Sequence, residues 1–458
     1  MQARRRLTMP PSAQVAAGAA GVCAGVATGV AVTVDVRIGI LLALAAVAVP
    51  VALIDVPLAA AVWVGLGMVS ALPAFGLATT AAGLLLLVAW LVWLPGELAH
   101  AVAALRLHRR LLVCVALLLG WLMLSLTWAQ DAGEAGPEVL RWWTAALALV
   151  VLLTTVRTER DVRLLIVALI AGALLSVLIG VAGGSLGSPA TSVDTATSTE
   201  GRLQGGADDP NYLAAYLVAI GALAVAIRPR LDGLVRLAIP AVIVVLAAGL
   251  LATQSRGGLI AVLAALATAL VLLPDRRLAI GLCALAFGLG AVAYVAAEPS
   301  ALERITTASE DRGNGREDLW RVATRMSTEH PVAGVGLGNF RVRSGEYVRE
   351  PGALQYVDLI VDRPHEVHNT YLQLLAETGL VGLGLFLAVV VAAMGAAWRA
   401  AQRFQTAGAL ALARLSRAVL VAQVGFLVAA VFLSAASRSM LWVLLALGPL
   451  LLGLRTRG

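Results

Sequence analysis

The feature that most constrains this chain is a series of long apolar blocks that contain no ionisable side chain, such as 237–252 and 441–454. A soluble domain must expose a polar face, and about a quarter of its residues are charged. This chain is only 13% charged and is 60% hydrophobic. A helix in a bilayer needs no polar face, because it satisfies its own backbone hydrogen bonds. We therefore predict an all-α, polytopic integral membrane protein.

The apolar blocks of spanning length number about 12 to 14, since a transmembrane helix needs roughly 17–25 residues. The block at 57–73 is the weakest, because Pro57 and Pro73 bracket a stretch short enough to be re-entrant. The predicted spans are 12–33, 37–54, 57–73, 77–95, 110–128, 139–156, 162–182, 210–227, 237–254, 257–273, 278–296, 370–397, 416–434 and 439–454.

Arginines flank the predicted spans and set their orientation, because the chain contains no lysine and all 34 of its Lys and Arg positions are arginine. Placing Arg4, Arg5 and Arg6 in the cytoplasm leaves most arginines of the short loops on the cytoplasmic side, as the positive-inside rule requires. Both termini are then cytoplasmic, and the first helix is retained rather than cleaved as a signal peptide. The net charge of +7 is a topology signal and does not predict a nucleic-acid partner.

Polar residues on the predicted outer side gather in two loops, at 183–209 and 297–369. The second loop is long enough to be functional; its stretch Glu317–Met326 predicts an amphipathic helix. Its four aromatic residues favour a packed cap over a solvated one; they are Trp320, Phe340, Tyr347 and Tyr356. The chain thus divides into N-terminal helices (1–182), central helices with two arginine loops (183–296), the long extracytoplasmic loop (297–369) and C-terminal helices (370–458).

The three cysteines, Cys23, Cys114 and Cys283, all lie in apolar segments and form no C-x-x-C pair. We therefore expect neither a disulfide framework nor a cysteine metal site.

Two arginines stand in glycine-rich outer turns. Arg256 follows Ser255 and precedes two glycines, and Arg202 precedes the helix start at Asp209-Pro210. A guanidinium suits bidentate binding of phosphate or carboxylate. A lone arginine at the membrane surface is, however, more often an anchor that reaches into the headgroups. Residue type alone favours the anchor.

Two histidines, His365 and His368, stand where the long loop re-enters the membrane. Their spacing is not that of an H-E-x-x-H zinc site, so a metal is the less favoured function. A single histidine near neutral pH fits a general base. An ordinary surface histidine is at least as consistent with the residues, and His330 is also available on this face.

Four motifs together resemble the signature of the O-antigen ligase and O-antigen polymerase superfamily. Their order is an Arg-Gly turn, one hairpin, a long loop, and a His-Asn pair that opens a helix. The motifs are Ser255–Gly258, Gly315-Arg316 with Trp320, Gly334–Phe340 and His368–Gly382. The resemblance covers the half of the chain from Arg202 onward.

The resemblance implies a GT-C-like membrane glycosyltransferase of the bacterial cytoplasmic membrane that needs no metal or other cofactor. Its partners would be a glycan donor on polyprenyl diphosphate, a glycan or other envelope acceptor, and the bilayer. Arg256 and Arg202 would clamp the diphosphate, and His368 would accept the proton of the acceptor hydroxyl. Asn369 and Glu377 would orient groups at the site, Arg316 would contact glycan or tie the cap together, and His365 is the second choice for the base.

Two alternatives remain open at this stage. Within the superfamily, a ligase attaches a finished polysaccharide to another molecule, whereas a polymerase joins repeat units. In a different class, a solute transporter has a similar number of helices, but transporters place polar groups near the bilayer midplane. Here the ionisable residues lie at the membrane surface, which favours surface chemistry. We expect Arg256 and His368 to face each other across an outward-opening cavity.

Overall fold

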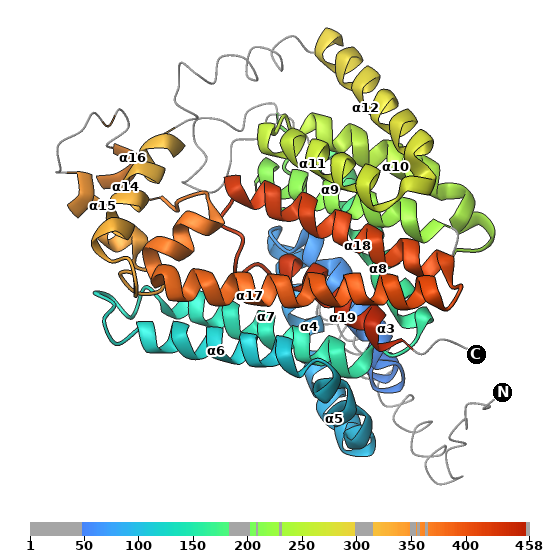
Figure 1. Ribbon diagram of the computed structural model, residues 1–458, viewed down its shortest axis with the longest axis horizontal. Coiled ribbons are helices and arrows are strands. Elements are labelled where there is room, and N and C mark those ends of the chain that lie inside the picture. The colour runs from blue at the N-terminus through green and yellow to red at the C-terminus, as the bar shows by residue number, and fades with distance from the viewer. Residues whose placement is uncertain are drawn as a thin grey trace, which may run out of the picture.

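The computed structural model describes residues 48–182, 202–207, 209–228, 231–297, 315–348, 354, 358–361 and 365–454, and these residues form helices and turns without a strand. The all-α prediction is therefore confirmed. Figure 1 shows the helices, whose bounds are α3 (Val56–Leu66), α4 (Pro73–Trp93), α5 (Leu98–Leu107), α6 (Arg109–Ser125), α7 (Gly136–Thr155), α8 (Glu159–Ala182), α9 (Pro210–Ile227), α10 (Gly233–Ala252), α11 (Arg256–Leu272), α12 (Arg277–Ala297), α14 (Arg316–Glu329), α15 (Phe340–Val348), α16 (Asp358–Val361), α17 (Thr370–Thr406), α18 (Leu410–Ala429) and α19 (Ser439–Gly453).

Within the described residues, eight helical segments are long and apolar enough to cross a membrane, and three shorter apolar helices accompany them. The chain is thus a polytopic membrane protein, as predicted. Most predicted spans from 77–95 onward match helices to within four residues, and 210–227 coincides with α9. The exceptions are 416–434, since α18 already begins at Leu410, and 370–397. The predicted span 12–33 and most of 37–54 lie outside the described residues.

Three segments differ from the predicted spans. The weak block at 57–73 forms only the short α3 followed by a 3₁₀ turn. Residues that were predicted to connect two spans form α5. His100 and Arg106 interrupt its apolar sequence, so hydropathy alone did not indicate a helix there. Helix α17 continues to Thr406, well past the predicted end at 397, because its last turns leave the apolar segment as a polar helix with Arg399 and Arg403.

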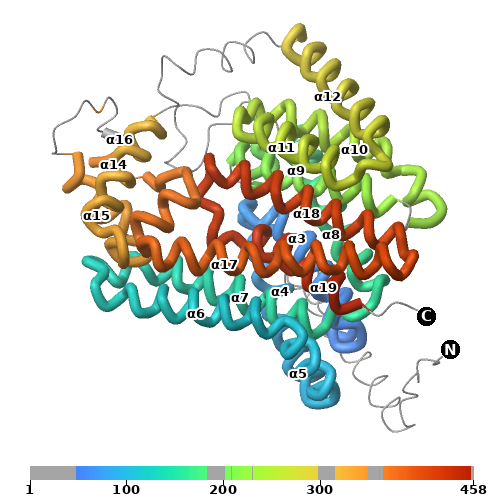
Figure 2. The backbone as a smooth tube through the Cα atoms, viewed as in Figure 1, coloured from blue at the N-terminus to red at the C-terminus, as the bar shows by residue number. Residues whose placement is uncertain are grey.

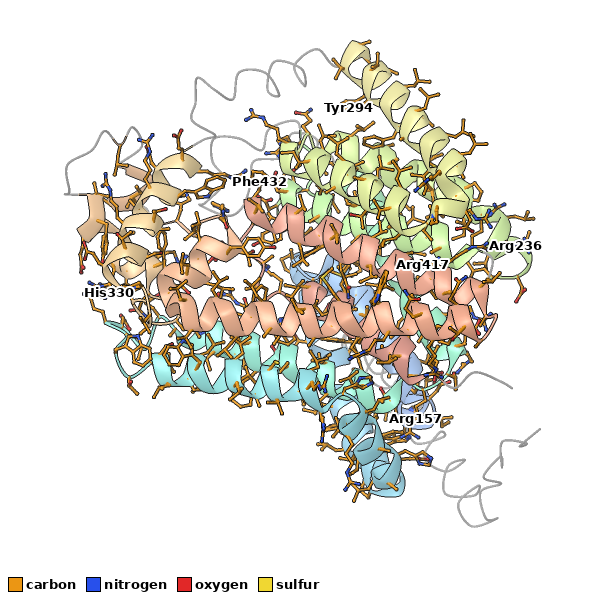
Figure 3. All side chains as sticks on the ribbon, viewed as in Figure 1. Arg157, Arg236, Tyr294, His330, Arg417 and Phe432 are labelled. Carbon is orange, nitrogen blue, oxygen red and sulfur yellow. The ribbon has the colours of Figure 1, made fainter. Side chains whose placement is uncertain are left out.

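In the described residues, the arginine-rich turns lie at one end of the helix bundle, and the segment that carries His330 lies at the other. Figure 3 shows Arg236 and Arg417 towards the end opposite the end that carries His330. At the arginine-rich end, Arg414 Nη2 lies 2.6 Å from Asp275 Oδ2. The other end carries the cap, which we define as α14, α15, α16 and the loop between α14 and α15. The predicted division of the chain into four parts and the cytoplasmic assignment of the arginine-rich end stay predictions.

The core lies around α18, which packs against α9, α17 and α19, and Figure 2 shows α17 and α18 side by side. Its large side chains include Trp142 of α7, whose ring meets those of Phe386 and Trp442 edge to face at centroid distances of 6.3 and 6.0 Å. Helix α12, in contrast, has no buried residue and carries apolar side chains all round, as expected for a helix that faces lipid.

The cap has a small core of its own. The predicted amphipathic helix is confirmed as α14, which buries one face through Leu319, Val322, Ala323 and Met326. Phe340 and Tyr347 of α15 are buried against that face, and Trp320 packs at its edge. The packed cap is therefore confirmed for these aromatic residues, whereas Tyr356 lies outside the described residues.

Candidate active site

Helices α9 and α11 begin side by side, and one amide joins their first turns. Ser255 caps α11 by accepting a hydrogen bond from the Gly258 backbone N–H at 3.1 Å, and its hydroxyl donates to Asn211 Oδ1 at 2.8 Å. Arg202 donates from Nη2 to the same oxygen at 3.1 Å and from Nε to the Thr253 carbonyl at 2.9 Å. The structure therefore holds Arg202 against the N-termini of two helices.

Arg256 is the first residue of α11 and follows a strained turn. Gln254 has a φ of 49°, which side chains other than glycine rarely adopt. Gly257 directly follows Arg256, and a Cβ at this position would lie 2.9 Å from Phe432 Cδ2. Only glycine therefore allows the Phe432 ring to approach this closely. Close packing against Phe432 therefore explains the glycine at position 257.

Phe432 connects the Arg256 turn to His368, and Figure 3 shows it where the bundle meets the cap. The Trp320 ring lies 6.2 Å from the Phe432 ring, centroid to centroid. Trp320 also donates from Nε1 to the carbonyl of Val367 at 3.1 Å, directly before His368. Arg256 and His368 thus lie at the same end of the bundle, joined by this chain of contacts.

His368 is the second of the two described non-glycine residues with positive φ, at 51°. It is half-buried and directly precedes Asn369, which caps α17 by accepting from the N–H groups of Tyr371 at 3.0 Å and Leu372 at 3.1 Å. Asn369 therefore has a structural role as the N-cap of α17, and the expectation that it orients groups at the site stays a prediction. Strained residues that a fold keeps cluster at functional sites.

Arg316 is the first residue of α14, after Gly315 with a φ of 78°. Burial lowers the pKa of its guanidinium; the charge of Asp209 opposes this shift and the charge of Arg256 adds to it. The structure thus brings together Arg316, Arg256 and the Asp209 cap of α9, three groups from distant parts of the sequence.

Arg438 and Tyr212 were not predicted as site residues. The Arg438 guanidinium carbon lies 4.5 Å from the centre of the Tyr212 ring, and the Tyr212 hydroxyl donates to the Ser434 carbonyl at 2.6 Å. Arg438 stands in a short turn between two apolar segments, as Arg256 does. That signal is present in the sequence, and we overlooked it because such an arginine is usually an anchor.

Glu377 lies at a break in α17. Gly379, with a φ of 66°, interrupts the helix there. The freed carbonyls of Ala376 and Glu377 accept from the N–H groups of Val335 at 3.0 Å and Gly336 at 2.8 Å. The Glu377 carboxylate accepts from the Gly338 N–H at 3.0 Å. The glycine motif of the cap therefore fits onto the break in α17.

The other two outer histidines lie elsewhere at this end. His365 is buried, with 9% of its surface exposed. His330 Nε2 lies 3.4 Å from Arg343 Nη1 at the cap. Among the described residues, no group of three His, Cys, Asp or Glu is arranged to hold a metal ion.

Four arginines therefore collect where helices begin; they are Arg202, Arg256, Arg316 and Arg438, which we call the arginine cluster. Arg256 and Arg316 are the first residues of α11 and α14, Arg438 directly precedes α19, and Arg202 bonds to the first turn of α9. Helix N-termini carry partial positive charge, so cations there are unfavourable unless an anion binds. The arrangement suits an anionic ligand.

Residues 241–387 match the family described as O-antigen ligase. This segment is similar to an O-antigen ligase domain. It contains Arg256, Arg316, His368 and Glu377, whereas Arg202 lies outside it. Its family favours an O-antigen ligase or polymerase-like membrane glycosyltransferase over a solute transporter. The search of curated proteins found no match to this chain.

Proposed function

We propose that the protein transfers an oligosaccharide or polysaccharide from a polyprenyl-diphosphate donor to a hydroxyl acceptor at the outer face of the cytoplasmic membrane. The observation that carries this proposal is the arginine cluster at the positive ends of several helices, at the same end of the bundle as His368. Cations at helix N-termini oppose the usual preference, so their collection at one place supports a strongly anionic substrate group.

The diphosphate of the donor is that group. Arg202 and Arg256 bind its oxygens, and Arg316 is close enough to Arg256 for their charges to interact. Asp209 offsets part of the charge of Arg316, and an anion bound between the two guanidiniums would further reduce their repulsion. The diphosphate gains negative charge as it leaves, so the same arginines stabilise the transition state more than the bound donor.

His368 is the general base. The acceptor oxygen attacks the anomeric carbon, and the bond from that carbon to the diphosphate oxygen breaks. The acceptor proton passes to the His368 imidazole, and the polyprenyl diphosphate leaves as an anion. The configuration at the anomeric carbon is inverted, because attack and departure occur on opposite faces. No residue in this step requires a metal.

Transfer by the purified full-length protein tests the proposal. The donor is undecaprenyl-diphosphate oligosaccharide, supplied with candidate glycan acceptors in detergent or liposomes. His368→Ala should lose roughly 10²–10⁴-fold in rate, as removal of a general base does. Arg256→Ala should lose about 10²–10³-fold, as removal of one transition-state donor does.

Matched variants at the cap serve as controls. His330→Ala and Arg321→Ala change the same residue types, and the exposed Arg321 pairs with Glu317 at 2.8 Å on the surface of α14. Both should transfer glycan as the parent does. If His368→Ala and Arg256→Ala also do so, the proposed mechanism is wrong.

The product distinguishes a ligase from a polymerase. Growth of the glycan on its own lipid carrier indicates a polymerase, and a single transfer to a different molecule indicates a ligase. Movement of an unmodified solute across liposomes, without any glycan transfer, would instead restore the transporter alternative.

A further inference from the structure

Two adjoining cavities open beside the arginine cluster, and neither is lined by Arg256 or His368. They enclose about 330 and 460 Å³ of space, part of it open to solvent. Four side chains line both cavities; they are Glu138, Glu366, Gln373 and Glu377, which we call the glutamate pocket.

The pocket adjoins the predicted base. Glu366 and Thr370, which line one cavity, stand two residues before and two residues after His368. The Thr370 hydroxyl donates to the Leu433 carbonyl at 2.5 Å and accepts from the Ala435 N–H at 2.9 Å, so the start of α17 is tied to the turn before α19. That turn forms another wall of the cavity.

Two buried polar atoms in the cavity wall have no hydrogen-bond partner. Gln373 donates from Nε2 to Glu377 Oε1 at 3.4 Å, but its Oε1 is buried and unpaired. The Ser434 hydroxyl is also buried and unpaired, although its carbonyl accepts from Tyr212. Buried polar atoms of folded proteins nearly always have partners, so each of these two atoms calls for a partner in the cavity, which water or a polar ligand supplies.

The charges of the pocket limit what that ligand is. The carboxyl groups of Glu138, Glu366 and Glu377 outnumber the arginines that line the two cavities, so an anion would not be paired there. Arg141, which pairs with Glu138, and Arg341 line the neighbouring cavity and disfavour a cation. A neutral molecule with many hydroxyl groups fits, because it donates to the carboxylates and to Gln373 Oε1 while it accepts from the arginines.

We infer that the glutamate pocket binds a neutral, hydroxyl-rich sugar unit beside His368, an inference that rests on the proposed function. The apolar wall formed by Trp142, Leu337 and Leu374 covers part of the same cavity, and sugar-binding sites combine apolar surface with a few placed polar groups. The sugar belongs either to the acceptor or to the donor glycan, because both share this chemistry.

Direct binding tests the pocket without any need for transfer. The probes are glucose, galactose, mannose, N-acetylglucosamine and their disaccharides, measured by saturation-transfer difference NMR on the full-length protein in detergent. At least one probe should bind, and Gln373→Leu and Glu366→Gln should each weaken its binding at least tenfold. Gln405→Leu, at the far end of the same helix, is the matched control and should bind as the parent does.

Binding of inorganic diphosphate in the same samples separates a local effect from a folding defect. It should be unchanged in Gln373→Leu, because that variant leaves the arginine cluster intact. Absence of binding by every sugar, or equal sugar binding by the parent and both pocket variants, overturns the inference.

Transfer kinetics identify the source of the sugar and keep the two proposals distinct. A rise of the KM for the acceptor in Gln373→Leu assigns the pocket to the acceptor, and a rise of the KM for the donor assigns it to the donor. If the parent transfers no glycan but binds a sugar that the variants lose, the proposed function fails and the pocket stands. If the parent transfers glycan and Gln373→Leu changes neither KM, the pocket inference fails alone.

Discussion

The guanidinium of Arg202 and the side-chain oxygen of Asn211 form a 3.1 Å hydrogen bond, and the Ser255 hydroxyl donates to the same oxygen at 2.8 Å. Asn211 is buried, with 8% of its surface exposed. One amide oxygen therefore positions both an arginine of the cluster and the cap of the helix that begins with Arg256.

Asn211→Ala should lower glycan transfer by roughly tenfold or more, because a hydrogen bond to a charged group contributes about 1.5–3 kcal/mol. The measurement is kcat/KM for the polyprenyl-diphosphate donor. Arg202→Ala should lower it as well, and the double variant should be little worse than Arg202→Ala alone, since the two residues act together. Losses that multiply in the double variant would contradict this coupling.

His368 has a φ of 51°, which is strained for a residue other than glycine. Substitutions at this position can therefore change stability and transfer activity independently. An L-residue in the left-handed region costs roughly 1–2 kcal/mol, and glycine avoids that cost. His368→Gly should therefore unfold at a higher temperature than His368→Ala, while both lose transfer. Thermal unfolding in detergent measures the first effect. Equal unfolding temperatures would show that the backbone relaxes without strain.

The helices of this fold were predictable because the signal for a membrane span is local. Residues 210–227 read as one apolar block and coincide with α9. The amphipathic period of Glu317–Met326 likewise predicted α14. Polar helices that leave the apolar segment, such as the end of α17, carry no such signal and were missed.

The site was predictable only in part, because its contacts are not local. Residue type alone favoured a membrane anchor at Arg256, and only the family resemblance predicted that this arginine binds the diphosphate. Tyr212 and Ser434, which are 222 positions apart, form a hydrogen bond beside Arg438. No pattern in the sequence pairs such distant segments, so Arg438 and the role of Asn211 emerged from the fold.

The break in α17 at Gly379 should not tolerate a side chain. A Cβ there would lie 2.1 Å from the Val332 carbonyl oxygen, in a backbone conformation with a φ of 66°. Gly379→Ala should destabilise the protein by at least about 2 kcal/mol through strain and displacement of the cap loop. Thermal unfolding and the yield of folded protein measure the effect.

Gly384 supplies the control for this prediction on the same helix. A Cβ at Gly384 would meet nothing within 4 Å. Gly384→Ala should be neutral or stabilise the helix by up to about 1 kcal/mol, since alanine is the better helix former. Similar unfolding temperatures for the two alanine variants would mean that the break at Gly379 is not needed for the fold.

Glu366 should make stability depend on pH. Burial raises the pKa of its carboxyl group; the charge of Arg438 opposes the shift most strongly, Glu138 adds to it, and Arg341 and Arg141 also oppose it. Below the ordinary glutamate pKa of about 4.3, Glu366 is protonated in both folded and unfolded chains, and its contribution to stability is fully present. That contribution is lost as the pH rises through the raised folded-state pKa, because the folded chain must then hold a buried charge.

Glu366→Gln cannot ionise, so it should not share this loss. The unfolding temperature of the parent should therefore fall relative to that of Glu366→Gln as the pH rises from about 4.3 through the raised pKa. Exposed Glu317 supplies the control, because Glu317→Gln should keep a nearly constant difference from the parent over the same range. A parent that gains stability over Glu366→Gln with rising pH would reverse the sign and show that the ionised carboxylate is the form that the folded site stabilises.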